Sequence, residues 1–365
     1  MPPPEGHNPD HPCVRWPSRR DSRATLGVTN SAHASRQPVT TRAQHSGMDV
    51  AALDLGSNSF HLLVARVRGG LPPEKLTSSK ETLRFGESVH RTGSIAEDKF
   101  ARGISTLETM LAIARSFGCE RIAAVGTSAL RDASNGSAFL EKARQRCGIE
   151  VDLLSGDEEA ELVYRGVSSA NYDLPARLGI VDIGGGSVEI AAGQSQVCEL
   201  VRSLPLGFLR LGRVQGIAES RAVSAKVNAG AAEAVRWLRA YRPAGWVFTG
   251  GTARAFDGVA RRLYPASAAA LSAAAVQRVA TAIAVADGGR LRELGVPLAR
   301  LETFAAGVAV LAAFVEQVGA PSIRICRAGL REGVVAREIE AAERERLGLG
   351  RNRRALGDRA LGVSV

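Results

Sequence analysis

Short apolar runs alternate with longer amphipathic runs along most of the chain. Apolar runs of roughly four to eight residues are typical of buried strands, and apolar positions that recur every three or four residues are typical of helices. We therefore predict helices over 97–117, 137–146 and 156–169, and strands over 50–55, 60–67, 121–125, 149–154, 178–183, 188–192 and 246–248. This alternation predicts βα units around mixed or parallel sheets, and thus an α/β protein.

The two ends of the chain lack this patterning. Residues 1–47 are rich in Pro, Ser, Arg and His and show neither a strand nor a helix period, so we expect a disordered extension. Met48 directly precedes the first predicted strand, and whether it is the true start is left open. Residues 347–365 are predicted to be a flexible tail.

Composition and charge narrow the class of protein. The 365 residues, 45% hydrophobic and 23% charged, suggest two globular domains. The net charge of +10 would favour a polyanionic substrate, whereas only 5% aromatic residues and no basic stripe argue against nucleic acid. We find no unbroken apolar stretch of about 18 residues and no secretory signal, so we expect a cytoplasmic protein without a membrane partner. Five scattered cysteines predict neither a zinc site nor a disulfide framework.

One short module occurs twice. Residues 53–60 and 181–188 each place an aspartate (Asp54, Asp182) after a buried strand residue, a glycine two positions later (Gly56, Gly184), and then a small polar turn. A chance likeness of two strand–turn–strand segments is the alternative. We interpret the repeat as two lobes built on one plan that face each other across a cleft.

The turns of this module suit phosphate binding. Glycine-rich turns present backbone N–H groups to an anion, and 56–59, 184–186 and a third turn at 249–252 fit that need. Asp54 and Asp182 stand at strand ends, where a carboxylate would bind Mg²⁺ directly or through water. Capping of the turn is the other common role of an aspartate in such a place.

A carboxylate is the best candidate for a general base. Glu158, Glu159 and Glu161 cluster at the start of one helix, and only one of them need face the cleft. His61 lies in a strand pattern and is expected to be a half-buried structural residue. Near the turns, three arginines could contact phosphate oxygens, namely Arg84, Arg131 and Arg254, with Arg131 the best placed.

Six motifs in order carry a family resemblance. They are Ala52-Leu53-Asp54-Leu55-Gly56-Ser57-Asn58-Ser59-Phe60-His61, Gly126-Thr127-Ser128-Ala129-Leu130-Arg131, Ser155-Gly156-Asp157-Glu158-Glu159-Ala160, Asp182-Ile183-Gly184-Gly185-Gly186-Ser187-Val188-Glu189, Gly251-Thr252 and Gly329-Leu330-Arg331-Glu332-Gly333. Together they span about 48–342. The chain thereby resembles the exopolyphosphatase and guanosine pentaphosphate phosphohydrolase family (Ppx/GppA), within the actin-like ATPase superfamily.

The resemblance implies two actin-like (ribonuclease H-like) lobes with mixed sheets flanked by helices and an active site in the cleft between them. The first lobe would span 48–155, the second 156–328, and a C-terminal helix over 329–346 would return to the first lobe. The chain ends soon after that helix, unlike the longest family members with their appended helical domains. Processive digestion of long polymers is therefore in doubt.

The resemblance also assigns roles to residues. Glu159 would act as base for the attacking water, and Asp54, Asp182 and Glu189 would hold or orient Mg²⁺, or another divalent cation, and water. The predicted substrate-binding residues are Ser57, Asn58, Ser59, Arg84, Arg131, Gly184, Gly185, Gly186, Ser187, Gly251 and Thr252.

The function implied is hydrolysis of the terminal phosphoanhydride of inorganic polyphosphate, short chains above all, or of guanosine pentaphosphate. Two alternatives remain at this point: a phosphotransferase of the same superfamily, and a non-catalytic regulator that binds polyphosphate or a guanosine polyphosphate. Preference between the substrates, the native metal and formation of a homodimer are left open.

Overall fold

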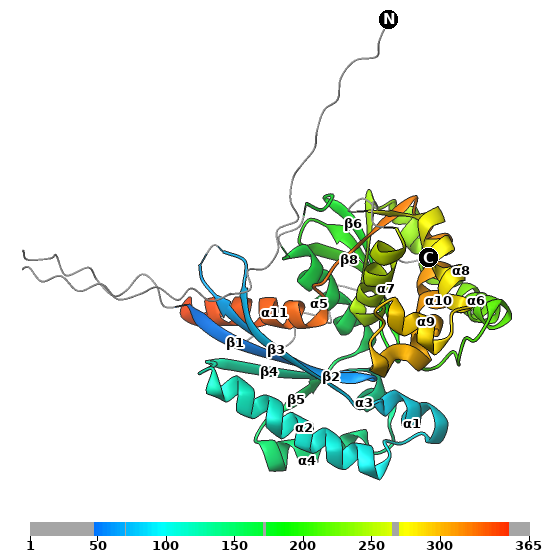
Figure 1. Ribbon diagram of the computed structural model, residues 1–365. Coiled ribbons are helices and arrows are strands. Elements are labelled where there is room, and N and C mark those ends of the chain that lie inside the picture. The colour runs from blue at the N-terminus through cyan, green and yellow to red at the C-terminus, as the bar shows by residue number, and fades with distance from the viewer. Residues whose placement is uncertain (1–46, 70, 171–172, 265–269, 350–365) are drawn as a thin grey trace, which may run out of the picture. The chain divides into compact units, whose positions relative to one another are not determined.

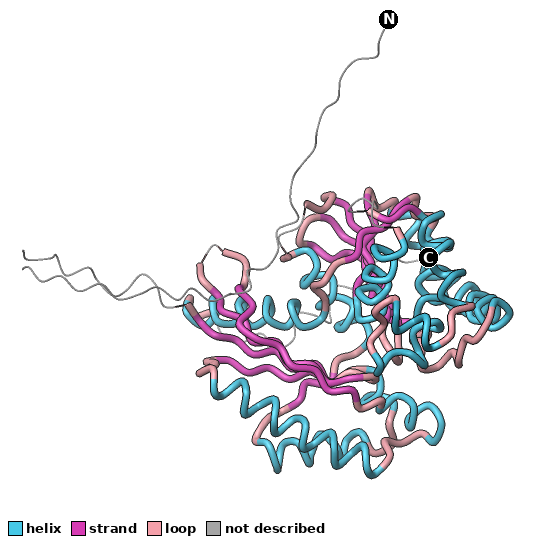
Figure 2. The backbone as a smooth tube through the Cα atoms, in the orientation of Figure 1, coloured by secondary structure: helices cyan, strands magenta, loops and turns pink. Residues whose placement is uncertain are grey.

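The computed structural model describes residues 47–69, 71–170, 173–264 and 270–349, which belong to one compact unit beginning at Gly47 (Figures 1 and 2). The predicted N-terminal extension, apart from Gly47, and most of the predicted C-terminal tail lie outside the described residues. Two sheets, each covered by helices, make up this unit. We call the parts built on them the first and second lobes.

The sheet of the first lobe has the order β3-β2-β1-β4-β5, with β1 to β3 antiparallel and β4 and β5 parallel to β1. Its strands are β1 (Met48–Leu55), β2 (Ser59–Val67), β3 (Glu74–Thr82), β4 (Arg121–Gly126) and β5 (Val151–Leu153). The helices of this lobe are α1 (Phe85–Thr92), α2 (Glu97–Ser116), α3 (Ser128–Asp132) and α4 (Gly136–Cys147). Because β1 is buried on both faces, its sequence is apolar almost throughout.

The sheet of the second lobe repeats this plan, with the order β10-β11-β9-β6-β7-β8. Its strands are β6 (Arg177–Ile183), β7 (Val188–Gln194), β8 (Val197–Leu204), β9 (Gly245–Thr249), β10 (Leu271–Ser272) and β11 (Ser322–Ile325). The helices are α6 (Ile217–Tyr241), α7 (Gly250–Leu263), α8 (Ala273–Ala284), α9 (Gly288–Glu293) and α10 (Leu301–Val318), the last preceded by the 3₁₀ turn η1 (Leu298–Arg300).

The repeat seen in the sequence therefore extends to whole sheets. β6, β7 and β8 correspond to β1, β2 and β3, and β9 corresponds to β4. Asp54 pairs across the strands with His61, and the equivalent Asp182 pairs with Glu189. The predicted class of two mixed α/β sheets is confirmed. The exact lobe boundaries stay a prediction.

Two helices connect the lobes, α5 (Gly156–Ser168) and α11 (Leu330–Arg346). In Figure 1, α11 lies on the face of the first sheet opposite to α2 and α4. The two helices approach so closely that a Cβ atom on Gly333 would lie 1.8 Å from the Leu162 carbonyl oxygen. A Cβ on Gly166 would lie 2.0 Å from the Gly329 carbonyl oxygen. Glycine at both positions is thus what permits this crossing.

One described helix, Leu298–Val318, is long and apolar enough to cross a membrane by length and composition. Of its apolar stretch, 72% is buried inside the structure, which is typical of a core helix. The alanine-rich helix α8 is likewise packed against α10.

Candidate active site

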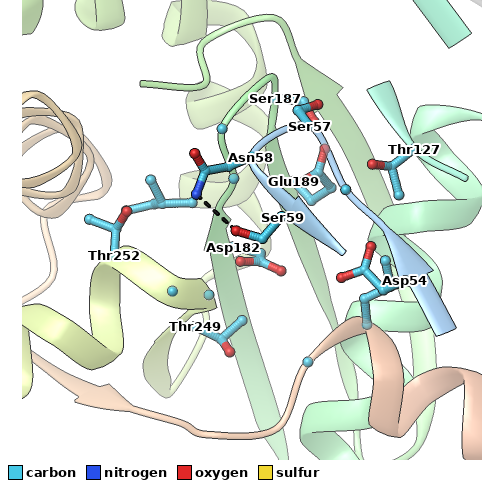
Figure 3. A pocket seen from close by; sticks show the side chains of 18 of the residues that line it. Asp54, Ser57, Asn58, Ser59, Thr127, Asp182, Ser187, Glu189, Thr249 and Thr252 are labelled. Carbon is cyan, nitrogen blue, oxygen red and sulfur yellow. Dashed lines mark hydrogen bonds between the residues drawn. The ribbon is translucent and has the colours of Figure 1, made fainter. Parts of the chain in front are cut away.

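A pocket forms where the turns of both lobes meet. In Figure 3, Asp54 and Ser57 come from the first lobe, and Asp182, Ser187 and Glu189 enter from the second. The empty volume of the pocket, which includes solvent at its open side, is about 800 Å³. Its walls are made by Asp54, Gly56, Ser57, Asn58, Ser59, His61, Thr127, Glu159, Asp182, Ile183, Gly184, Gly185, Gly186, Ser187, Glu189, Phe208, Thr249, Gly250, Gly251, Thr252, Arg254, Arg300, Gly329, Leu330, Arg331 and Glu332.

The two repeated turns pack directly against each other. A Cβ atom on Gly186 would lie 2.3 Å from the Ser128 hydroxyl oxygen and 2.6 Å from that of Ser57. A Cβ on Gly185 would lie 3.1 Å from the Cβ of Asn58. Side chains at these two glycines would therefore hold the turns apart, so glycine sets the width of the pocket between the lobes.

Hydrogen bonds orient the peptide groups of the second turn. The carbonyl oxygens of Gly184 and Gly185 accept bonds from the N–H groups of Phe208 (3.3 Å) and Leu209 (2.9 Å), and that of Gly186 accepts from the Arg210 guanidinium (2.6 Å). In a trans peptide the N–H points opposite to the carbonyl. The amides that follow these carbonyls, those of 185–187, are thus the donors that this turn can offer to an anion.

The first turn is held in the same manner. The carbonyl oxygen of Ser57 accepts from the Gly86 N–H at 2.8 Å, and that of Asn58 accepts from the Arg84 N–H at 2.9 Å. The Ser57 hydroxyl accepts from the N–H of Ala129 at 3.0 Å, which ties the turn to the start of α3. The Asn58 amide donates to the Ser59 hydroxyl at 3.1 Å, the bond drawn in Figure 3.

Three carboxylates share the centre of the pocket, and burial raises the pKa of each. The pKa of Asp54 rises to about 7, with a further increase from the nearby charge of Asp182 and an opposing effect of Arg331. The pKa of Asp182 rises to about 6 and that of Glu189 to about 7. Carboxyl groups that resist ionisation in this way attract a cation or a proton.

Glu159 is the one glutamate of its cluster that lines the pocket. Glu158 caps its own helix by accepting the Ser155 N–H at 2.7 Å, and Glu161 pairs with Arg165 at 3.2 Å. The side chain of Glu159 is buried, and one carboxylate oxygen has no hydrogen-bond partner. Burial and the neighbouring Glu189 raise its pKa well above the ordinary value, and Arg131, 3.6 Å away, opposes that rise.

The donor set fits a hard divalent cation. Asp54, Asp182 and Glu189 offer only carboxylate oxygens, and Glu159, whose Oε2 accepts no hydrogen bond but lies 3.6 Å from Arg131, lines the same pocket. Within the described part of the chain, no group of three or more His, Cys, Asp or Glu could by itself hold a metal ion. Mg²⁺ is commonly bound through one or two carboxylates, waters and substrate phosphates, so this arrangement suits it.

Three arginines, Arg254, Arg300 and Arg331, also line the pocket, and we call them the arginine wall. Burial lowers the pKa of Arg300 to about 10, and Arg254 adds to that effect. Burial also lowers the pKa of Arg254, with Arg331 contributing. Burial holds the pKa of His61 well below its ordinary value, and Arg331, Lys80 and Arg254 lower it further. Buried arginines that repel one another favour a bound polyanion.

Most residues predicted for the site meet in this pocket. Two predicted substrate-binding residues, Arg84 and Arg131, do not line it. Arg84 lies at the N-cap of α1 and pairs with Glu302 of the second lobe at 2.7 Å. Arg131 donates to the Leu154 carbonyl at 2.5 Å and faces Glu159.

Arg300, Arg331 and Glu332 line the pocket and were not predicted from the sequence. His61 lies half-buried in β2, as predicted, and also lines the pocket. Arg331 and Glu332 belong to the last of the six motifs, which was the available signal. Arg300 belongs to no motif, and nothing in the sequence distinguishes it from the many other arginines.

Comparison with known sequences agrees with the family resemblance that the six motifs carry. The model of the Ppx/GppA phosphatase family matches residues 63–342. Exopolyphosphatase 1 of Mycobacterium tuberculosis is 30% identical over 315 residues, which cover 80% of this chain and 89% of that protein. A guanosine-5'-triphosphate,3'-diphosphate pyrophosphatase of Aliivibrio fischeri is 31% identical over 296 residues, but the match spans only 58% of its length.

Solved structures agree in fold. An exopolyphosphatase from Cytophaga hutchinsonii superposes with a TM-score of 0.71 at 22% identity, covering 80% of this chain and 98% of that one. A Ppx/GppA family member from Aquifex aeolicus gives a TM-score of 0.67 at 23% identity, covering 81% and 98%.

Proposed function

The chain belongs to the Ppx/GppA phosphatase family, and from that premise we propose that it hydrolyses the terminal phosphoanhydride of inorganic polyphosphate or of guanosine pentaphosphate. The observation that carries the proposal is one pocket lined by Glu159, by two amide-rich turns and by three arginines. A phosphate chain needs that combination, because its terminal group must meet both donors and an activated water.

In this proposal Glu159 is the general base. Its raised pKa makes the carboxylate a stronger base than an exposed glutamate, so it can accept a proton from the water that attacks the terminal phosphorus. The amides of 185–187, with those of the first turn, would hold the non-bridging oxygens of that phosphoryl group. Arg131 would orient Glu159 by facing its carboxylate, in addition to the substrate contact predicted from sequence.

Asp54, Asp182 and Glu189 would hold Mg²⁺, or another divalent cation, together with waters and substrate oxygens. When bound, the cation supplies positive charge to the terminal phosphoryl group and to the departing oxygen. The same charge would favour the ionised form of the three carboxylates, whose pKa values are raised by burial.

The arginine wall supports a substrate with several phosphates. Arg254, Arg300 and Arg331 line the same pocket as the two turns, so they would be available to bind the next phosphates of a chain, or the second phosphorylated end of a guanosine polyphosphate. We favour polyphosphate, because the match covers 89% of exopolyphosphatase 1 of Mycobacterium tuberculosis but only 58% of the guanosine pyrophosphatase.

A parallel assay tests this function. Purified protein with Mg²⁺ is offered short polyphosphate, long polyphosphate and guanosine pentaphosphate, without any phosphoryl acceptor, and released orthophosphate is measured. We expect release from short polyphosphate or from the nucleotide, or from both. Release that requires an added acceptor would instead identify a phosphotransferase, and tight binding without release would identify a regulator.

A further inference from the structure

The Glu189 carboxylate is bound by a serine, Ser203, that does not line the pocket. Ser203 stands directly opposite Glu189 in the pairing of β7 and β8. Its hydroxyl donates to the Glu189 carboxylate at 2.8 Å. Glu189 is only 2% exposed, and a carboxylate buried to that degree needs donors that fix its orientation. Ser187 donates from the pocket side, so Ser203 fixes the carboxylate from the side that substrate does not reach.

Ser203 also touches the helix that carries Glu159. A Cβ atom on Gly156, the first residue of α5, would lie 2.4 Å from the Cβ of Ser203 and 2.8 Å from its hydroxyl oxygen. The start of α5 therefore rests on Ser203. One small side chain thus contacts both the backbone that presents Glu159 and the carboxylate of Glu189.

The repeated plan of the lobes makes this position informative. In the first sheet Asp54 pairs with His61, which pairs in turn with Lys80. In the second sheet the equivalent series is Asp182, Glu189 and Ser203. The third strand thus places the cation of Lys80 opposite His61 in the first lobe. In the second lobe it places the uncharged hydroxyl of Ser203 opposite the Glu189 carboxylate. A hydroxyl at 203 donates a hydrogen bond to Glu189 without adding a charge.

We propose that Ser203 is a positioning residue for phosphoanhydride hydrolysis, which acts by fixing the Glu189 carboxylate relative to Glu159. This inference rests on the proposed function. Groups that hold a metal-orienting carboxylate from its far side typically change metal affinity or activity by about 10- to 100-fold when removed. Because Ser203 does not line the pocket, its loss should lower kcat and leave KM nearly unchanged.

The test compares Ser203→Ala with Ser224→Ala, a matched change in the same lobe, where the hydroxyl donates only to a carbonyl of its own helix. With short polyphosphate and saturating Mg²⁺, we expect Ser203→Ala to lower kcat about 10- to 100-fold and Ser224→Ala to match the wild type. On a Glu189→Gln background the same Ser203→Ala change should cost nothing further. Equal kcat for the two single variants would overturn the proposal.

A loss that persists in full on the Glu189→Gln background would also overturn it, because Ser203 would then act through its packing on Gly156. If Ser203→Ala does not fold, the nearly isosteric Ser203→Cys, a weak donor, should show the same fall in kcat.

A second measurement needs no turnover. Mn²⁺ binding in the presence of orthophosphate, followed by the EPR signal of the free ion, should weaken about tenfold or more in Ser203→Ala. Unchanged Mn²⁺ affinity would contradict the role of Ser203. If the wild type releases no phosphate from any substrate, the proposed function fails, while this binding measurement still tests Ser203.

Discussion

The crossing of α5 and α11 offers a sharp test of how the fold positions the base. Gly333→Ala would place a methyl group 1.8 Å from the Leu162 carbonyl oxygen, whereas carbon and oxygen normally stay about 3.3 Å apart. The helices must therefore separate by roughly 1.5 Å. Overpacking of this kind typically costs about 1 to 3 kcal/mol, which corresponds to a fall in Tm of roughly 1 to 5 °C for a protein of this size.

The larger effect should be on catalysis. α5 carries Glu159, and the first turn of α11 carries Arg331 and Glu332, which also line the pocket. A misplacement of about 1 Å between reacting groups can lower the rate about 100-fold. We therefore expect Gly333→Ala to lower kcat far more than the loss of stability explains, at a temperature where the variant is fully folded.

The measurements are kcat for short polyphosphate and Tm by calorimetry. Gly258→Ala is the matched control, since Gly258 also lies within a helix but a Cβ there would meet only the flexible end of Arg262 at 3.7 Å. It should leave kcat unchanged and Tm equal or slightly higher. If Gly333→Ala lowers Tm but retains wild-type kcat, the crossing does not position Glu159 and the reasoning is refuted.

Three further predictions concern the pocket. Arg131→Met removes the charge that opposes the raised pKa of Glu159, so the acid limb of the pH profile of kcat should move to higher pH; an unmoved limb with a raised KM would indicate a substrate contact instead. Burial raises the pKa of Asp54 from 3.8 to about 7, so the folded protein binds this proton more tightly than the unfolded chain does. The contribution of Asp54 to the free energy of unfolding therefore falls as the pH rises between those two values. Asp54→Asn should flatten that fall in metal-free urea unfolding, and an identical pH dependence would contradict it. Arg300→Ala should raise KM about 10- to 100-fold with little change in kcat, as expected for loss of a charged hydrogen bond to bound substrate, and an unchanged KM would exclude the contact.

The part of the fold around the turns could be predicted because each strand there is buried on both faces. β1 and β6 are apolar almost throughout, so their positions and the repeat of Asp54 and Asp182 stand out from the sequence. β3 was missed because it is mostly polar and none of its residues is buried, and no residue of β8 is buried either. These two strands form by pairing with β2 and β7, and the local sequence does not indicate that pairing.

The same distinction applies to the site. The turns and Glu159 lie in short motifs, so the family and its fold were predicted from them and are confirmed. The local pattern alone left Glu158, Glu159 and Glu161 equivalent; the structure separates them by a helix cap and an ion pair. Long-range packing brings Arg300 to the pocket from a 3₁₀ turn, and brings Ser203 to Glu189 from an edge strand, so no local pattern identifies them.

The central claim is that Glu159 activates the water that attacks a phosphoryl group held by both turns. Glu159→Gln keeps the shape of the side chain and removes the base, with Glu158→Gln as control because Glu158 only caps its helix. Turnover and equilibrium binding of short polyphosphate are measured for both variants. We expect Glu159→Gln to bind as the wild type does and to lose roughly 100- to 10,000-fold in kcat, while Glu158→Gln turns over normally. Turnover by Glu159→Gln at the rate of the wild type would show that Glu159 is not the base.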